Sequence, residues 1–131
     1  MPTRLASSTR RVDAGFAADW YQGYVQRDLS QTNLPIPLSV MQLGDVGLVF
    51  HPGELYSCYG LTIQRDSPLA DTLVVGYTDD CFGYLPDPNA YKAAEYSAVT
   101  VPKIIDLPPF TPTSARTLAA ASIEMLKTVV A

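Results

Sequence analysis

The sequence has few of the residues that usually build a self-contained metal or redox site. Its 131 residues include a single histidine, His51, and two cysteines, Cys58 and Cys81. Zinc sites are commonly built from CxxC pairs or several histidines, so the cysteines are not expected to hold a metal. The two cysteines fall on neighbouring predicted elements, and two free thiols are favoured over a disulfide between them.

Positive charge and long apolar runs are scarce as well. Lysine and arginine number 9 against 13 acidic residues, which gives a net charge of −4. No basic cluster extends beyond Arg10-Arg11, so nucleic acid is not expected as a partner. No apolar run approaches the roughly 18 residues that cross a bilayer. Residues 1–11 lack the apolar centre of a secretion signal, and the compartment stays open.

Common nucleotide-binding and hydrolase motifs are also missing. The sequence contains no P-loop, GxGxxG, GxSxG or HExxH pattern and no internal repeat. What it does contain is 47% hydrophobic and 17% charged residues, which is typical of a globular chain. The length of 131 residues suits one domain.

Within that domain we separate residues 1–36, a lead-in and helix, from residues 37–131. Residues 14–30 have the helical spacing of an apolar stripe that includes Phe16, Trp20 and Tyr24. Core packing explains this stripe better than a carbohydrate- or lipid-facing ridge. Pro35 and Pro37 end the helical pattern, because proline favours extended backbone.

Residues 37–131 alternate strand and helix signals. The expected elements are a β-hairpin over 38–42 and 46–50, a helix from 52 to about 65, a buried strand over 72–77, a short helix over 89–96, an extended or irregular stretch over 99–107, and a final helix from 113 or 114 to about 130. The strand–helix–strand order predicts parallel neighbours. The predicted fold class is therefore α+β: a small mixed β-sheet, made of the hairpin and a parallel βαβ strand, packed against helices.

Polar side chains follow the two strands that should end side by side. They are His51 and Glu54 after the first, and Asp79, Asp80 and Tyr84 after the second. A carboxylate and a phenol can both bind a hard metal ion. Each residue also has a structural explanation, since Glu54 would suit the first turn of a helix and Asp79-Asp80 a turn. On residue patterns alone, the structural explanation is favoured.

Three segments in series resemble the last part of the catalytic domain of the neutral/alkaline non-lysosomal ceramidase family. Residues 43–55 (LGDVGLVFHPGEL) resemble the family's strand and PGE motif. Residues 73–86 (LVVGYTDDCFGYLP) resemble its next strand, loop and Gly-Tyr pair. Residues 89–91 and 94–96 resemble the helix that follows. The resemblance covers residues 37–129 and not residues 1–36.

The resemblance implies a zinc-dependent amidohydrolase that cleaves the amide of ceramide, an N-acyl lipid. The family holds its zinc with two histidines, a glutamate and a tyrosine. The PGE glutamate falls on Glu54 and the Gly-Tyr tyrosine on Tyr84. His51 and Asp79 become candidates for residues that contact the two ligands and position them. The family commonly has asparagine at the position of Asp79.

The sequence departs from the family in one decisive way. The two zinc histidines lie far upstream of the PGE motif, and His51 is at neither position. The chain is then a segment of a larger hydrolase, a shortened relative, or one half of a site completed by a second chain or copy. We expect no turnover from these 131 residues alone. The alternatives are a non-enzymatic structural or protein-binding module with a vestigial site and, less favoured, an independent enzyme that uses Glu54 and Asp79 as an acid/base pair.

Overall fold

The computed structural model describes residues 33–105 and 107–130. The chain divides into two units, Met1–Leu34 and Pro35–Ala131, and the fold below is that of the second unit. The helix predicted over residues 14–30 lies outside the described residues.

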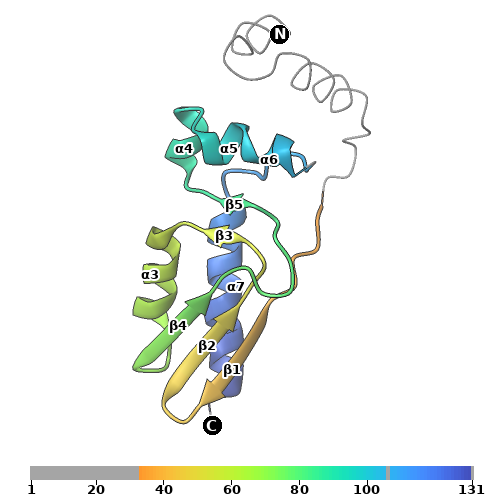
Figure 1. Ribbon diagram of the computed structural model, residues 1–131. Helices are drawn as coiled ribbons and strands as arrows, with labels where there is room; N and C mark the ends of the chain where they lie inside the picture. The colour runs from red at the N-terminus through yellow and green to blue at the C-terminus, as the bar shows by residue number, and fades with distance from the viewer. Residues whose placement is uncertain (1–32, 106, 131) are drawn as a thin grey trace, which may run out of the picture. The chain divides into compact units, whose positions relative to one another are not determined.

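Three strands form a mixed sheet in the order β1-β2-β4 (Figure 1). Strands β1 (Ser39–Leu43) and β2 (Val46–Phe50) form an antiparallel hairpin. Its tight turn contains Gly44 with φ +60°, a backbone conformation that glycine adopts without strain. Strand β4 (Asp71–Val75) pairs with β2 in parallel. The predicted hairpin and parallel strand are both confirmed.

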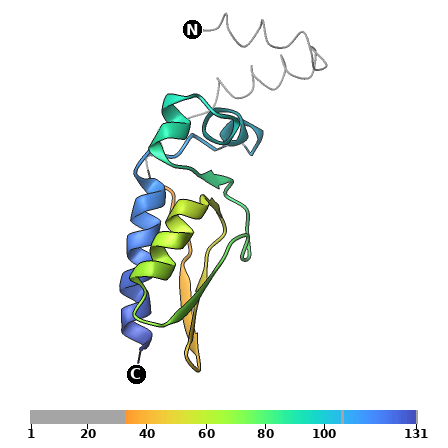
Figure 2. The same ribbon diagram turned by 90° about the vertical axis from the view of Figure 1, so that its left-hand side faces the viewer.

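The two faces of this sheet have different surroundings. Helices α3 (Ser57–Asp66) and α7 (Ser114–Val129) pack against one face (Figure 2). In the described part of the chain, no helix covers the other face, where Leu73 is 55% and Met41 45% exposed. The prediction that the second strand is buried is therefore only half right. Thr72 on β4 is buried, but β4 is an edge strand that is covered on one face only, and Leu73 and Val75 on its other face are exposed.

The main core lies between this sheet and the two helices. Its buried members are Val49 from β2, Ile63 from α3, and Ala119 and Leu126 from α7. Burying a side chain of the size of Leu126 contributes about 1.5–3 kcal/mol. A second cluster surrounds the buried residues Leu85, Ala115 and Leu118.

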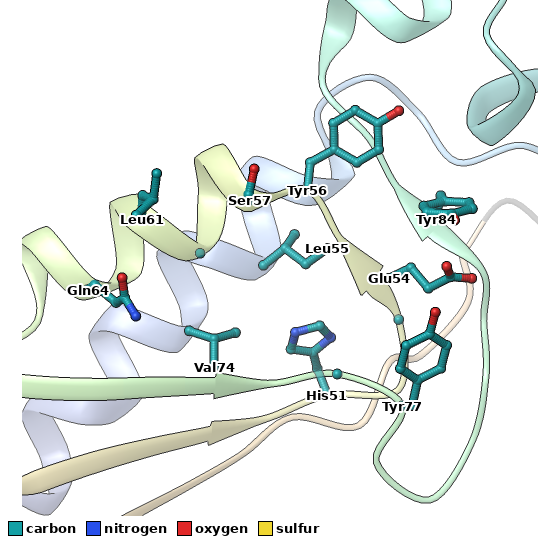
Figure 3. A pocket seen from close by; sticks show the side chains of 13 residues that line it. His51, Glu54, Leu55, Tyr56, Ser57, Leu61, Gln64, Val74, Tyr77 and Tyr84 are labelled. Carbon is teal, nitrogen blue, oxygen red and sulfur yellow. The ribbon is translucent and has the colours of Figure 1, made fainter.

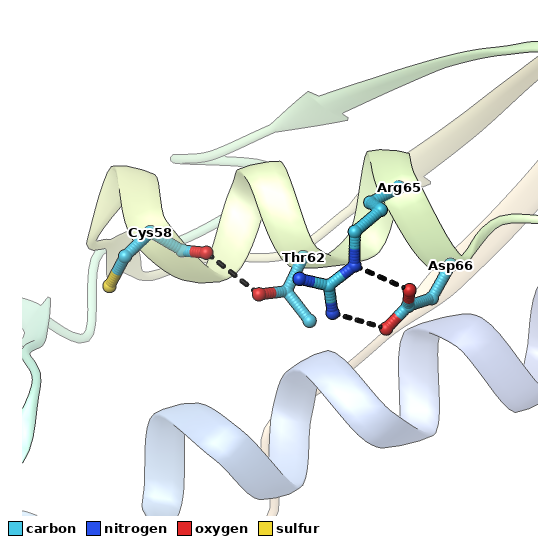
Figure 4. Close-up of polar contacts among 4 residues, drawn as sticks. All are labelled: Cys58, Thr62, Arg65 and Asp66. Atoms are coloured by element: carbon cyan, nitrogen blue, oxygen red, sulfur yellow. Dashed lines mark hydrogen bonds and ion pairs between the residues drawn. The ribbon is translucent and has the colours of Figure 1, made fainter.

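Helix α3 contributes Tyr59 and Ile63 to the core, and Leu55 contacts it from β3. Cys58, on α3, is exposed. Figure 4 shows the Cys58 side chain directed away from the helix, with its carbonyl accepting a hydrogen bond from the Thr62 hydroxyl at 2.9 Å. Cys81 is exposed as well, and both thiols are free.

The C-terminal end of α3 carries an exposed ion pair. The Arg65 guanidinium donates to both carboxylate oxygens of Asp66 at 2.7 Å (Figure 4). Surface pairs of this kind contribute little to stability, because water and salt screen the two charges, so this one is a minor feature.

A second, two-stranded parallel sheet was not predicted. It consists of β3 (Glu54–Leu55) and β5 (Tyr84–Leu85). The prediction that Pro52-Gly53-Glu54 begins a helix is therefore wrong, because α3 starts only at Ser57. The backbone N–H of Glu54 donates to the Gly83 carbonyl at 2.8 Å, and this pairing replaces the first turn of a helix.

Three short helices follow β5. They are α4 (Pro88–Lys92), α5 (Tyr96–Val99) and α6 (Val101–Ile104). The Asp87 side chain caps α4. The prediction of an extended or irregular stretch over residues 99–107 is wrong where α6 forms. Pro102 stands in the first turn of α6, where the missing N–H would have no helical partner anyway.

The final helix, α7, agrees with its predicted bounds. Thr113 occupies the N-cap position, although its side chain makes no capping hydrogen bond. Val130 lies beyond the end of the helix and is 39% exposed. No described helix is both long and apolar enough to span a membrane.

Candidate functional site

The candidate site lies where β2 and β4 end side by side. Phe50 and Val75, the last residues of the two strands, are register partners. The next residue, His51, continues the pairing, because its N–H donates to the Val75 carbonyl at 3.0 Å. Its carbonyl in turn accepts from the N–H of Thr78 at 3.1 Å. Both chain segments are therefore fixed as they leave the sheet.

Glu54 and Tyr84 meet just beyond these strand ends. They are register partners in the parallel β3–β5 pair, which places their side chains on the same face. Two backbone bonds hold the pair: Glu54 N–H to the Gly83 carbonyl at 2.8 Å and Tyr56 N–H to the Leu85 carbonyl at 3.2 Å. A hydrogen bond to Glu54 and the charge of its carboxylate raise the pKa of the Tyr84 hydroxyl.

A second tyrosine, Tyr77, also reaches Glu54. A hydrogen bond to the Glu54 carboxylate, with partial burial and the carboxylate charge, raises the pKa of Tyr77 to about 12. Figure 3 shows its hydroxyl directed toward that carboxylate. Sequence reasoning placed Tyr77 only at the end of a strand. Its φ of +57° turns the chain after β4, and no local pattern signals such a conformation for tyrosine.

A third tyrosine, Tyr56, closes the opposite side of Tyr84. The two rings are 6.3 Å apart in an edge-to-face arrangement. The Tyr56 hydroxyl lies 2.6 Å from the Ser97 hydroxyl and donates to a Glu95 carboxylate oxygen at 3.1 Å. Tyr56 therefore links the β3–β5 pair to the start of α5.

These residues border an open cleft of about 760 Å³ (Figure 3). Its lining residues come from β3, β5, α3, the end of β4 and the segments that follow β2 and β4: His51, Gly53, Glu54, Leu55, Tyr56, Ser57, Gly60, Leu61, Gln64, Val74, Gly76, Tyr77 and Tyr84. This lining contains one carboxylate and no lysine or arginine. The cleft therefore favours a cation or a hydrogen-bond donor over an anion.

His51 lies in the cleft but apart from the Glu54 carboxylate. Figure 3 shows its imidazole near Leu55 and Val74, whereas the Glu54 carboxylate points toward Tyr84 and Tyr77. His51 is only 2% exposed, and its Nδ1 has no hydrogen-bond partner in the described structure. Burial lowers the pKa of His51, which favours the neutral imidazole. Its role in supporting the ligands stays a prediction.

The two aspartates of the following loop lie outside the cleft lining. Asp79 is exposed and has a φ of +63°. The Asp80 carboxylate accepts a hydrogen bond from the Cys81 N–H at 2.7 Å, which is a turn interaction. The role of Asp79 in positioning the ligands stays a prediction.

The donor set fits half of a zinc site. Glu54 and Tyr84 place a carboxylate and a phenol together, as the tetrahedral chemistry of zinc allows. Among the described residues, however, no three histidine, cysteine, aspartate or glutamate side chains form a group that could hold a metal ion. Two further ligands would have to come from elsewhere.

Comparisons with family models, with curated proteins and with solved structures find no match to this chain.

Proposed function

We propose that this chain contributes a glutamate and a tyrosine ligand, Glu54 and Tyr84, to the zinc centre of a ceramidase-like amidohydrolase. The observation that supports this most directly is the register pairing of the two residues across β3 and β5. Their side chains meet although neither belongs to the larger sheet. The sequence resemblance over residues 43–55 and 73–86 assigns the same two residues to zinc.

The local architecture suits a ligand pair that must keep its geometry. The backbone of Glu54 is bonded to Gly83, and that of Tyr56 to Leu85, so both strands are fixed on either side of the two side chains. The Glu54 carboxylate lies beside the Tyr77 and Tyr84 hydroxyls, raises the pKa of both, and faces no positive side chain in the cleft lining. A carboxylate in this state attracts a cation. Tyr84 would give up its hydroxyl proton when its oxygen becomes a ligand.

Bound zinc would supply a water of lowered pKa as the nucleophile. The two remaining ligands, histidines by resemblance, would come from sequence beyond these 131 residues or from a partner chain, which could be a second copy. The apolar part of the cleft, lined by Leu55, Leu61 and Val74, suits the acyl chain of an N-acyl lipid amide.

A zinc titration of the full chain tests the proposal. Zinc binding to a tyrosine oxygen removes the hydroxyl proton, and ultraviolet difference absorption detects the resulting phenolate. We expect Glu54→Ala and Tyr84→Phe each to weaken zinc binding by about tenfold or more. The matched control is Tyr91→Phe, because Tyr91 is outside the cleft lining and should leave zinc affinity unchanged. Equal zinc affinities in wild type, Glu54→Ala and Tyr84→Phe would refute the proposal.

A second candidate is the non-enzymatic, protein-binding module. It is favoured by the outer face of the β1-β2-β4 sheet, where Met41, Leu73 and Val75 are exposed. The same titration separates the two candidates. In a binding module with a vestigial site, replacing Glu54 or Tyr84 should not change the zinc affinity.

A further inference from the structure

We propose that Tyr77 is a positioning residue for Glu54: its hydroxyl holds the carboxylate from the loop side and so directs it toward the ion site beside Tyr84. This inference rests on the proposed function. It adds a residue that the sequence resemblance does not assign and that comes from a separate segment of the chain, directly after β4.

The backbone at Tyr77 is the first argument. Its φ is +57°, in the left-handed region where a bulky side chain is uncommon. Glycine or asparagine would adopt this conformation with less strain. A bulky residue at such a position points to a role for its side chain.

The surroundings of Tyr77 fix its direction. Directly after it, the Thr78 N–H donates to the His51 carbonyl at 3.1 Å, and the Thr78 hydroxyl donates to the Val75 carbonyl at 3.3 Å. These two bonds tie the turn at Tyr77 to the residue after β2 and to the last residue of β4. The Tyr77 ring lies at the cleft, and its hydroxyl points toward the Glu54 carboxylate (Figure 3).

Burial does not account for this side chain, because Tyr77 is 61% exposed. The hydroxyl contact with Glu54 is what distinguishes tyrosine from any other aromatic residue at this position. A carboxylate has two oxygens with about four acceptor positions, so it can accept from two tyrosines at once. When Tyr84 turns from hydrogen-bond donor to metal ligand, Tyr77 remains as a hydrogen-bond donor to Glu54. Hydrogen-bonded partners of this kind orient metal ligands and raise metal affinity.

The experiment uses zinc titration of the full chain with three substitutions. We expect Tyr77→Phe, which keeps the ring and loses the hydroxyl, to weaken zinc binding by about 10–100-fold. Tyr77→Asn removes the hydroxyl but accepts the left-handed backbone. It should fold at least as stably as wild type in urea and still weaken zinc binding. Tyr91→Phe is again the control and should change nothing.

The outcomes separate the two proposals. Loss of affinity in Glu54→Ala and Tyr84→Phe, with Tyr77→Phe equal to wild type, overturns the role of Tyr77 and leaves the zinc site standing. Affinity that follows stability across the Tyr77 variants also overturns it, because Tyr77 would then act only on the fold. No response of zinc affinity to Glu54→Ala refutes the proposed function, and the role of Tyr77 with it.

Discussion

Glu54 reaches its place because two glycine backbones approach closely beneath it, and one methyl group tests this. A Cβ built on Gly76 would lie 2.9 Å from the carbonyl oxygen of Gly53, the residue before Glu54. That oxygen belongs to the backbone and cannot rotate away as a flexible side chain would. Moving it would pull on the bond from Glu54 N–H to the Gly83 carbonyl. Gly76→Ala should therefore strain the β3–β5 pair.

The expected magnitude follows from overpacking. Forcing a methyl group into a closed contact typically destabilises a protein by about 1–3 kcal/mol. The matched control is Gly60→Ala in α3, where an added Cβ meets nothing within 4 Å. Alanine should stabilise that helix by up to about 1 kcal/mol. Both substitutions change the entropy of the unfolded chain equally, so the free energies of unfolding of the two variants should differ by about 1–4 kcal/mol.

Urea unfolding followed by circular dichroism measures both free energies of unfolding, with all variants fitted as two-state transitions. Gly76→Ala should unfold at lower urea than wild type, and Gly60→Ala at equal or higher urea. If Gly76→Ala remains within about 0.5 kcal/mol of wild type, the close approach of the two backbones is wrong. The placement of Glu54 would then need another explanation.

Two further predictions concern the cap of α4 and the buried histidine. Asp87 accepts from the N–H groups of Asn89 at 2.8 Å and Ala90 at 3.0 Å. Asp87→Ala should therefore lower the free energy of unfolding by about 1 kcal/mol, whereas Asp87→Asn should retain most of it; equal losses would argue against the cap. His51 has a lowered pKa because burial disfavours its charged form. Below its ordinary pKa of 6.5, the unfolded chain binds a proton that the folded chain does not, so stability should fall as pH drops from 7 toward 5.5. His51 is the single histidine of the sequence, so His51→Gln should flatten the dependence of stability on pH. An unchanged pH profile in this variant would show that buried His51 does not cause the loss of stability.

Elements with local signals agree with the sequence analysis. The hairpin was predictable because short apolar strands flank a glycine–aspartate turn, and the observed turn has Gly44 at φ +60°. The cap of α4 was predictable because Asp87 precedes Pro88, a proline in the first turn. The parallel pairing of β2 and β4 followed from the strand–helix–strand order.

The failures occur where a distant partner outweighs a local preference. Pro52-Gly53-Glu54 has the composition of a helix start, yet Glu54 pairs with Tyr84 in a strand of two residues. A strand that short has no periodicity to detect, and its stability comes from its partner. Residues 99–107 were expected to be extended or irregular, but Val101–Ile104 form α6, with Pro102 in its first turn. In both cases tertiary contacts selected one of two locally acceptable conformations.

The sequence alone determined the α+β class, the hairpin, the parallel neighbour and the candidacy of Glu54 and Tyr84, because each of these is encoded in contiguous residues. The tertiary structure decided how the candidates meet. Two short strands, far apart along the chain, pair in register and place the carboxylate and the phenol on one face. It also added Tyr77, whose unusual backbone conformation turns its hydroxyl toward Glu54. A backbone dihedral and a pairing between distant segments depend on the folded surroundings, and these cannot be deduced from neighbouring residues.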